Sequence, residues 1–294
     1  MSGNSLSQSI SQPGCWLRVS GSDAGSFLQG QFTNDLRGLG PEGAVYGLWL
    51  NQKGKIVADS FILGGADGTY RVGSYFSPAA TIRQRLEDYI VADDVVVDDE
   101  TPAWSCVSLV GDGAGAWLRG LSPREGWIFP GRRSAGENWD WIYPSAASAS
   151  VRERVSGFSE LDATALERLR IESGIPAIPA DAGPGNLPEE AGLHDAAIST
   201  TKGCYLGQEI TARLRSKGTV RRRLMRVAGA GPIPPLPAPL LHDGRRVGEM
   251  RSAVADRQGT GFIGLAIVAA SLGPEAGPCH VEGRPGDAVF VEII

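Results

Sequence analysis

The chain has 294 residues, 42% of them hydrophobic, and a formal net charge of −5 at pH 7. Its 40 Gly and 19 Pro favour short elements joined by many turns and exclude a long-helix or coiled-coil protein. No run approaches the ~18 apolar residues of a membrane-spanning helix, and the first residues lack the charged and apolar regions of a signal peptide. We therefore expect a soluble, unexported, cytoplasmic chain without a membrane partner.

The charge is unevenly distributed. Residues 200–226 contain eight Lys and Arg residues against one Glu, so this stretch carries +7 and the rest of the chain −12. The cysteines lie far apart, without a Cys-x-x-Cys pair or a His at ligand spacing: Cys15, Cys106, Cys204 and Cys279. This spacing supports neither a zinc site nor a disulfide framework, and we expect reduced thiols.

The first predicted elements are a helix and a hairpin. Large apolar residues recur at helical spacing within residues 22–39, and Ser22 and Asp23 are available to cap the start of that helix. Two apolar strands follow, at 44–50 and 55–63, around a four-residue turn. This order predicts an amphipathic helix lying on a sheet.

Two further helices and a glycine-rich turn are predicted before residue 180. One helix starts at Ser77, because Ser-Pro is a common helix start. Another starts at Ser159 with a sequence like a capping box and ends at Gly174. Residues 111–116 formally fit a dinucleotide-binding fingerprint, but the following helix is too short and no acid follows at the ribose-binding distance. We interpret them as a turn between a strand and a short helix, and the acidic stretch 87–100 as a surface strand.

After residue 226 the chain changes character. A proline-rich segment is followed by short apolar runs that are broken by turn pairs. This pattern predicts a small β-barrel. The expected fold is an α+β region of one or two subdomains over residues 1–220, followed by a C-terminal β-barrel over 221–294.

Residues 198–213 read ISTTKGCYLGQEITAR and contain the cysteine of greatest interest. A nearby cation favours the thiolate form of a thiol, so Lys202 favours a reactive or ligating Cys204. Physical arguments alone leave a second interpretation open, in which Cys204 is buried and inert.

The segment 202–209 resembles the K-G-C-[YF]-x-G-Q-E signature of the YgfZ family, folate-binding proteins linked to iron–sulfur cluster assembly and repair. Residues 23–35, 53–55 and 170–176 agree with the same family, in order along the chain. The resemblance covers most of residues 20–225. It implies an α+β tetrahydrofolate-binding region before a terminal barrel.

The same superfamily includes the glycine-cleavage aminomethyltransferases, which also bind tetrahydrofolate. Those enzymes carry an acidic pair in the second strand of the early hairpin, where this chain has Ala58 and Asp59, and they lack the cysteine of the motif. We therefore expect an accessory factor rather than a turnover enzyme, with Cys204 and Lys202 as candidate reactive residues. A folate-dependent one-carbon transferase that uses Asp59 is the enzyme alternative.

The resemblance also suggests folate-binding side chains. Glu172 is our candidate to accept two parallel hydrogen bonds from the pterin edge. Asn34 and Asp35 can line the pocket or simply cap a helix, and Tyr205 can stack on a folate ring or pack in the core. The remaining candidates are Asp59, Gln208, Glu209 and Arg213.

The expected cofactor is tetrahydrofolate, which can be polyglutamylated, and the expected partners are iron–sulfur client or assembly proteins. The basic run 213–223 can attract a glutamate tail or RNA phosphates. No aromatic residues are interleaved with it, so an RNA-associated protein ranks as the second alternative. Stable clusters usually take four thiolates, so we expect no permanent metal or cluster.

Overall fold

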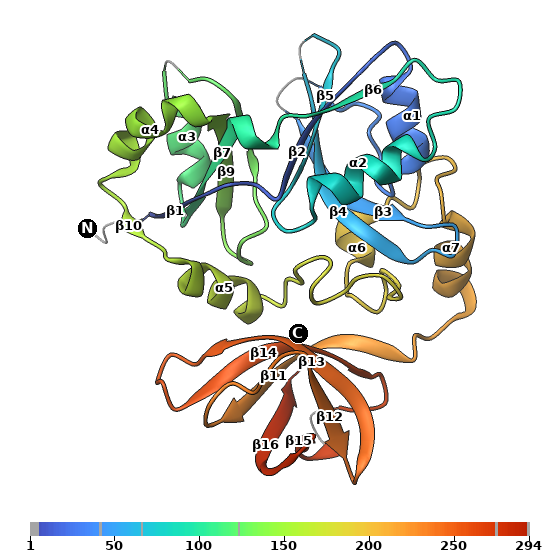
Figure 1. Ribbon diagram of the computed structural model, residues 1–294, viewed down its shortest axis with the longest axis vertical. Helices are drawn as coiled ribbons and strands as arrows, with labels where there is room; N and C mark the ends of the chain where they lie inside the picture. The colour runs from blue at the N-terminus through green and yellow to red at the C-terminus, as the bar shows by residue number, and fades with distance from the viewer. Residues whose placement is uncertain (1–5, 41–42, 66, 123, 274–275, 293–294) are drawn as a thin grey trace.

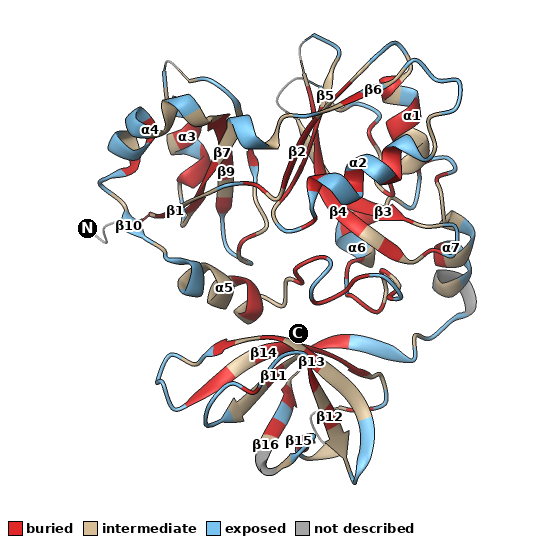
Figure 2. Cartoon of the chain, viewed as in Figure 1, coloured by how far each residue is buried: buried red, intermediate tan, exposed pale blue. Residues whose placement is uncertain are grey.

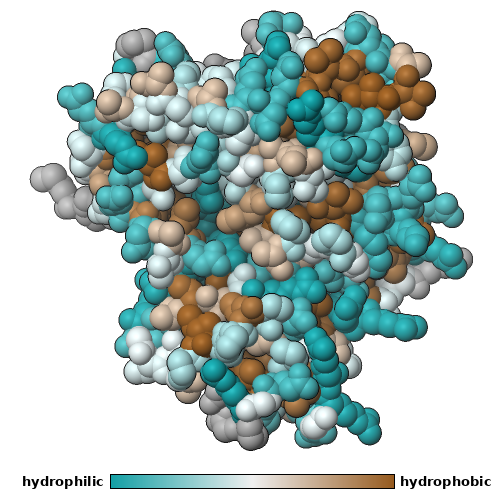
Figure 3. All heavy atoms as spheres, in the orientation of Figure 1, coloured by the Kyte–Doolittle hydropathy of each residue, from teal (hydrophilic) through white to brown (hydrophobic). Residues whose placement is uncertain are grey.

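The structure is a computed structural model that describes residues 6–40, 43–65, 67–122, 124–273 and 276–292. Two five-stranded sheets lie side by side above a closed barrel (Figure 1). Buried residues run along the strands of both sheets (Figure 2), and the face drawn in Figure 3 is mostly hydrophilic, with separate apolar patches. None of the described helices is long and apolar enough to cross a membrane.

In the first sheet every strand pairs antiparallel with its neighbours. Its order is β3 (Ala44–Leu50), β4 (Ile56–Gly64), β5 (Tyr70–Ser74), β2 (Cys15–Ser20) and β6 (Val96–Asp99). Helices α1 (Ala24–Gln31) and α2 (Ala79–Glu87) cover it, because Leu28 and Ile82 are buried in one cluster with Leu17 of β2.

The second sheet pairs antiparallel except where its edge strand joins β1. Its order is β10 (Ser159–Glu160), β1 (Ser7–Ser11), β7 (Trp104–Val110), β9 (Asn138–Pro144) and β8 (Trp127–Pro130). Its helical segments are η1 (Thr101–Ala103), α3 (Ala114–Gly120), η2 (Ser145–Ala147) and α4 (Ser148–Val155). Aromatic side chains join the two sheets: the ring centroids of Trp16 and Trp127 lie 5.5 Å apart, and those of Phe61 and Phe129 lie 4.9 Å apart.

The barrel closes in the order β11 (Arg222–Ala230), β14 (Gly261–Ala269), β13 (Arg245–Ala255), β12 (Ala238–His242), β15 (Cys279–Val281) and β16 (Arg284–Glu292). Helix α5 (Ala163–Glu172) packs on it, since Ile171 is buried with Leu265 and Ile267. Helices α6 (His194–Ala197) and α7 (Gln208–Lys217) lie in the segment between α5 and the barrel. The predicted α+β region followed by a terminal barrel is confirmed.

The predicted hairpin is confirmed by β3 and β4, but the first helix is shorter than predicted. It begins at Ala24 and ends at Gln31, after which Phe32 is extended and forms a bridge with Trp49 of β3. Apolar spacing continues past Gln31 because Phe32 and Leu36 belong to the same buried cluster without being helical. Asp23 is the N-cap residue, yet its carboxylate accepts from the Asp94 backbone N–H instead of capping the helix.

The start predicted for α5 at Ser159 is wrong. Ser159 and Glu160 form the short strand β10, which pairs with β1. The N-cap lies three residues later, at Asp162, whose side chain accepts a hydrogen bond of 2.7 Å from the Ala165 backbone N–H, and the helix begins at Ala163. Both residues are good N-caps, and pairing with β1 decides between them.

The glycine-rich segment is the predicted turn between a strand and a short helix. It joins β7 to α3, with Gly113 in the left-handed region. The amides of Gly113 and Gly115 donate to the carboxylate of Glu137. A carboxylate of the chain itself therefore occupies the position that a phosphate takes in nucleotide-binding turns.

Candidate functional site

The loop that carries the K-G-C motif gathers the segments that the resemblance singled out. It lies between α6 and α7, where the Ser199 amide donates to Thr33 O and the Leu206 amide donates to Gly30 O, just after and within α1. Gly207 has a φ of +85°, and a Cβ added there would lie 2.8 Å from Asn51 O in the β3–β4 turn. Residues 23–35, 53–55 and 202–209 thus meet at one place.

Lys202 fixes this loop to the end of α1. Its ammonium donates to three backbone carbonyls, those of Gln29 at 2.6 Å, Phe32 at 2.5 Å and Asn34 at 3.0 Å. Burial lowers the pKa of Lys202 to about 8, and the nearby Asp35 carboxylate opposes that shift. All three N–H bonds of the ammonium are used here. The role predicted for Lys202 as a partner of the thiol is therefore replaced by a tether between loop and helix.

Cys204 is exposed, whereas Cys15, Cys106 and Cys279 are buried. Burial raises the pKa of each buried thiol, which keeps it protonated. Among the residues that the structure describes, none forms a hydrogen bond with the Cys204 sulfur. The interpretation of Cys204 as a buried cysteine is wrong.

The other motif residues separate into core and surface. Tyr205 is buried, and its hydroxyl lies 2.9 Å from that of Thr211, so it packs in the core. Gln208 begins α7 and lines a cavity of about 310 Å³ together with Tyr205. Glu209 and Arg213 are exposed on α7.

Asn34 and Asp35 shape the turn after α1. The Asn34 side chain donates to Tyr46 O and accepts from the Asp35 amide. The Asp35 carboxylate accepts hydrogen bonds from Arg37 and Gln29, and the Arg37 guanidinium holds its pKa well below its usual range. Both side chains are occupied within the chain.

Asp59 lies on β4 of the first sheet, with its side chain enclosed. Its carboxylate accepts hydrogen bonds from the hydroxyls of Tyr46, Ser74 and Ser77, at 3.0, 2.9 and 2.7 Å. Burial raises its pKa, while the three hydroxyls oppose that shift. Asp59 is 6% exposed, so this acid is held away from solvent.

A cavity of about 300 Å³ opens where the two sheets meet α5. We name it the intersheet cavity, and its characteristic side chains are Tyr75, Phe76, Arg132, Arg133, Glu167 and Arg170. Phe76 is 38% exposed, the Arg133 guanidinium lies 3.6 Å from the Tyr75 ring centroid, and Glu167 pairs with Arg170. None of the ten residues predicted from sequence is among its lining residues.

Sequence reasoning missed these residues because they come from the ends of strands in different sheets and from α5. One signal was present: Arg170 begins the R-I-E-S-G segment that the resemblance had singled out. In that segment Glu172 was the predicted pterin acceptor. It lies two residues beyond Arg170, and its carboxylate is held by Arg257 of the barrel at 2.8 and 2.6 Å.

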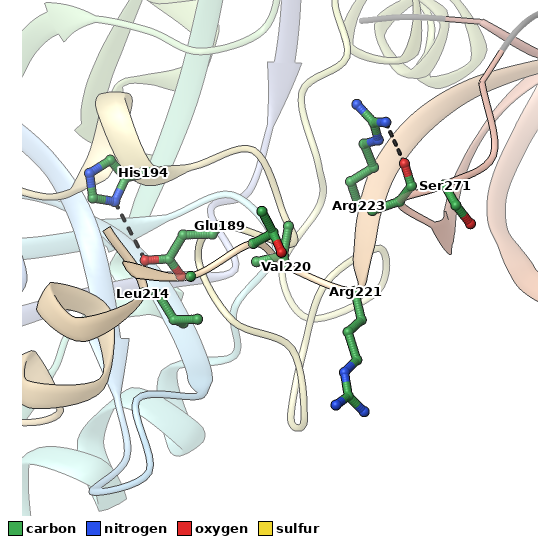
Figure 4. Close-up of a pocket in the computed structure, with 10 residues that line it drawn as sticks. Glu189, His194, Leu214, Val220, Arg221, Arg223 and Ser271 are labelled. Atoms are coloured by element: carbon green, nitrogen blue, oxygen red, sulfur yellow. Dashed lines mark hydrogen bonds and ion pairs between the residues drawn. The ribbon is translucent and has the colours of Figure 1, made fainter. Parts of the chain in front are cut away.

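A larger cavity, about 760 Å³, lies between α7, the linker to the barrel and the end of β14. In Figure 4 the His194 ring points toward Glu189, and Arg221 points away from both. The Nδ1 of His194 is 3.6 Å from a carboxylate oxygen of Glu189, whose pKa is raised by burial. Among the described residues, no group of three or more His, Cys, Asp or Glu side chains is placed to hold a metal ion.

Comparisons with known proteins agree with this architecture. The GCVT N-terminal domain family matches residues 16–127, and the CAF17 C-terminal β-barrel domain family matches residues 221–273. The aminomethyltransferase T structure from Bartonella henselae superposes with a TM-score of 0.82 at 18% identity, over 99% of this chain and 86% of that chain. At that identity the likeness shows the fold alone.

Curated relatives align over most of the chain. The mitochondrial iron–sulfur cluster assembly factor IBA57 of Mus musculus is 29% identical, over 95% of this chain and 81% of that protein. The tRNA-modifying protein YgfZ of Edwardsiella ictaluri is 33% identical, over 73% of this chain and 69% of that protein. With its GCVT-type sheets, its CAF17-type barrel and these relatives, the chain belongs to the GcvT/YgfZ-like family.

Proposed function

We propose that this chain acts in the assembly or repair of iron–sulfur enzymes, as a tetrahydrofolate-binding accessory protein whose Cys204 contacts the partner's iron or cluster. The observation that carries the proposal is the placement of Cys204, the exposed cysteine of the four, on a loop fixed by Lys202. Relatives named as iron–sulfur cluster assembly factors support it.

In this proposal Cys204 acts as a temporary ligand of the partner's iron or cluster. A thiolate is the usual protein ligand of iron in clusters, and stable clusters usually take four. Cys204 supplies one, so the remaining ligands come from the partner. Exposure of the sulfur gives the partner direct access, which a buried cysteine would not.

Complementation in a strain that lacks this protein tests the role of Cys204. Cys204→Ser is expected to lose rescue of iron–sulfur enzyme activities, because a serine hydroxyl is not ionised at neutral pH and is a poor iron ligand. Thr200→Ala, at an exposed position of the same loop, is the matched control and is expected to retain rescue. Full rescue by Cys204→Ser would overturn the proposal.

The intersheet cavity suits the head of a folate. Ligand pockets start at roughly 300 Å³, so this cavity has room for the bicyclic pterin and leaves the glutamate tail outside. Phe76 offers an apolar ring, and Arg132 and Arg133 offer donors. The Glu167 carboxylate, which also pairs with Arg170, has further lone pairs that can accept from the pterin N–H pair. Bound there, tetrahydrofolate would supply a one-carbon carrier next to these side chains.

Two glutamates on the same helix provide a matched test of this placement. Glu167→Gln is expected to weaken tetrahydrofolate binding by about tenfold or more, since a charged hydrogen-bond acceptor is lost. Glu172→Gln also breaks an ion pair of α5 but leaves the cavity lining intact, and binding is expected to be unchanged. Calorimetry on both variants decides which glutamate accepts from the pterin. Loss of binding in Glu172→Gln alone would contradict the role of Glu167 and support Glu172, the residue predicted from sequence.

An RNA-binding function has less support from the contacts of the +7 stretch. At least four of its eight cations bind within the described part of the chain: Lys202 to carbonyls, Arg222 to Glu190, Arg223 to Ala270 O, and Arg226 to Glu292. Relatives named as tRNA-modifying proteins keep this function as the second candidate. Its test is tRNA affinity that falls steeply with salt.

A further inference from the structure

A basic groove lies beside the loop that carries Cys204. It has a volume of about 380 Å³ and combines cationic with aliphatic side chains: Lys53, Lys55, Leu187, Ile210, Arg213 and Leu214. Lys53 and Lys55 come from the β3–β4 hairpin, and Arg213 comes from α7. The groove therefore lies between one of the three segments that meet at the motif and the helix that follows the motif.

The hairpin and α7 are held in close contact by two glycines. A Cβ at Gly54 would lie 2.9 Å from the Cβ of Ile210, and a Cβ at Gly207 would lie 2.8 Å from Asn51 O. Cys204 is three residues before Gly207, and three residues of extended chain span at most about 11 Å. One short peptide segment of a partner can consequently reach both the groove and the exposed sulfur of Cys204.

The two lysines are not neutralised by the described part of the chain. No described acidic side chain forms an ion pair with Lys53 or Lys55, whereas Arg18, Arg170 and Arg257 each have a carboxylate partner. Because no described acidic side chain neutralises these two lysines, their positive charge remains available to attract an external anion.

We propose that this groove binds an acidic segment of the protein partner that meets Cys204. The inference rests on the proposed function for the identity of that partner. A segment that alternates acidic and aliphatic residues matches a groove lined by both Lys53 and Lys55 and by aliphatic side chains such as Ile210. Aromatic rings are missing from the residues that line the groove, which disfavours a single-stranded RNA that binds by base stacking. The groove also shares no lining residue with the intersheet cavity.

Fluorescence anisotropy with a labelled peptide of alternating Glu and Leu tests the groove on the full chain. Lys53→Glu with Lys55→Glu is expected to raise the Kd roughly tenfold, in line with the loss and reversal of two charges that line the groove. The matched control reverses two exposed arginines elsewhere, Arg152→Glu with Arg245→Glu, and is expected to keep the Kd of the wild type. A peptide of alternating Lys and Leu should bind the lysine-reversal variant better than it binds the wild type.

Two results would overturn the inference. One is equal affinity of the Glu–Leu peptide for the wild type and for the lysine-reversal variant. The other is tighter binding at the groove by folate polyglutamate or by an RNA oligonucleotide than by the peptide. Cys204→Ser is expected to bind the peptide with the affinity of the wild type. The experiment therefore distinguishes an error in the proposed groove from an error in the proposed role of Cys204.

Discussion

Lys202 takes the place of a conventional helix cap. The last carbonyls of a helix have no partner within it and are commonly satisfied by a glycine-based turn or a nearby cation. After α1 the chain turns extended at Phe32, and a buried ammonium bonds the carbonyls of Gln29, Phe32 and Asn34 instead. One side chain thus stabilises both a helix end and the loop of Cys204.

Replacing Lys202 by methionine should therefore destabilise the fold. Three carbonyls lose a charged donor, at an expected cost of about 2–4 kcal/mol in the free energy of unfolding. Urea denaturation measures this change, and the exposed Lys53→Met serves as the control with an expected change of less than about 0.5 kcal/mol. An unchanged midpoint in Lys202→Met would contradict the tether.

The same comparison has a defined pH dependence. Burial lowers the pKa of Lys202 from its ordinary 10.5 to about 8. Between these values the folded chain binds fewer protons than the unfolded chain, so the wild type gains stability relative to Lys202→Met as the pH rises through this window. Below about pH 7 both states carry the proton, and the difference should be constant.

At the scale of elements, the motif loop depends on one glycine and tolerates change at another. Gly207 has a positive φ and lies against the β3–β4 turn, whereas a Cβ at Gly203 would meet nothing within 4 Å. The sequence alone does not show which of the two glycines is required. The contact of Gly207 with the β3–β4 hairpin does.

Gly207→Ala is expected to destabilise the chain by about 1–3 kcal/mol, through backbone strain and the contact with Asn51 O. Gly203→Ala is the matched control and should leave the thermal midpoint nearly unchanged. Differential scanning calorimetry on both variants checks the difference. Similar midpoints for the two variants would show that the loop does not need its contact with the hairpin.

Local sequence patterns predicted the helices and strands correctly where a single pattern of apolar and turn residues was present. The hairpin of β3 and β4 follows from two apolar runs around a polar turn. The apolar spacing past Gln31 overstated α1, because Phe32 is buried as a bridge residue. The start of α5 moved to Asp162 because Ser159 pairs with β1, about 150 residues earlier in the chain. A short stretch of sequence contains no information about pairings between residues so far apart.

At the scale of the whole molecule, the motif predicted one half of the candidate site. Residues around Cys204 were found from sequence, since a single segment contains them. The intersheet cavity needed the structure, because Tyr75, Arg133 and Arg170 come from three distant segments. Glu172 was chosen on resemblance, and its carboxylate pairs with Arg257 of the barrel instead of lining the cavity.

Arg170 also ties that cavity to the barrel. Its guanidinium bonds Glu167 on the cavity side, Asp181 in the following loop and the Ser252 hydroxyl on β13. A fragment cut at residue 220 would keep both sheets and the whole motif, yet it would leave a buried arginine with fewer partners at the cavity wall. Ligand affinities measured on such a fragment would describe a different pocket, and a substitution on β13 can alter this cavity although none of its described lining residues lies on β13.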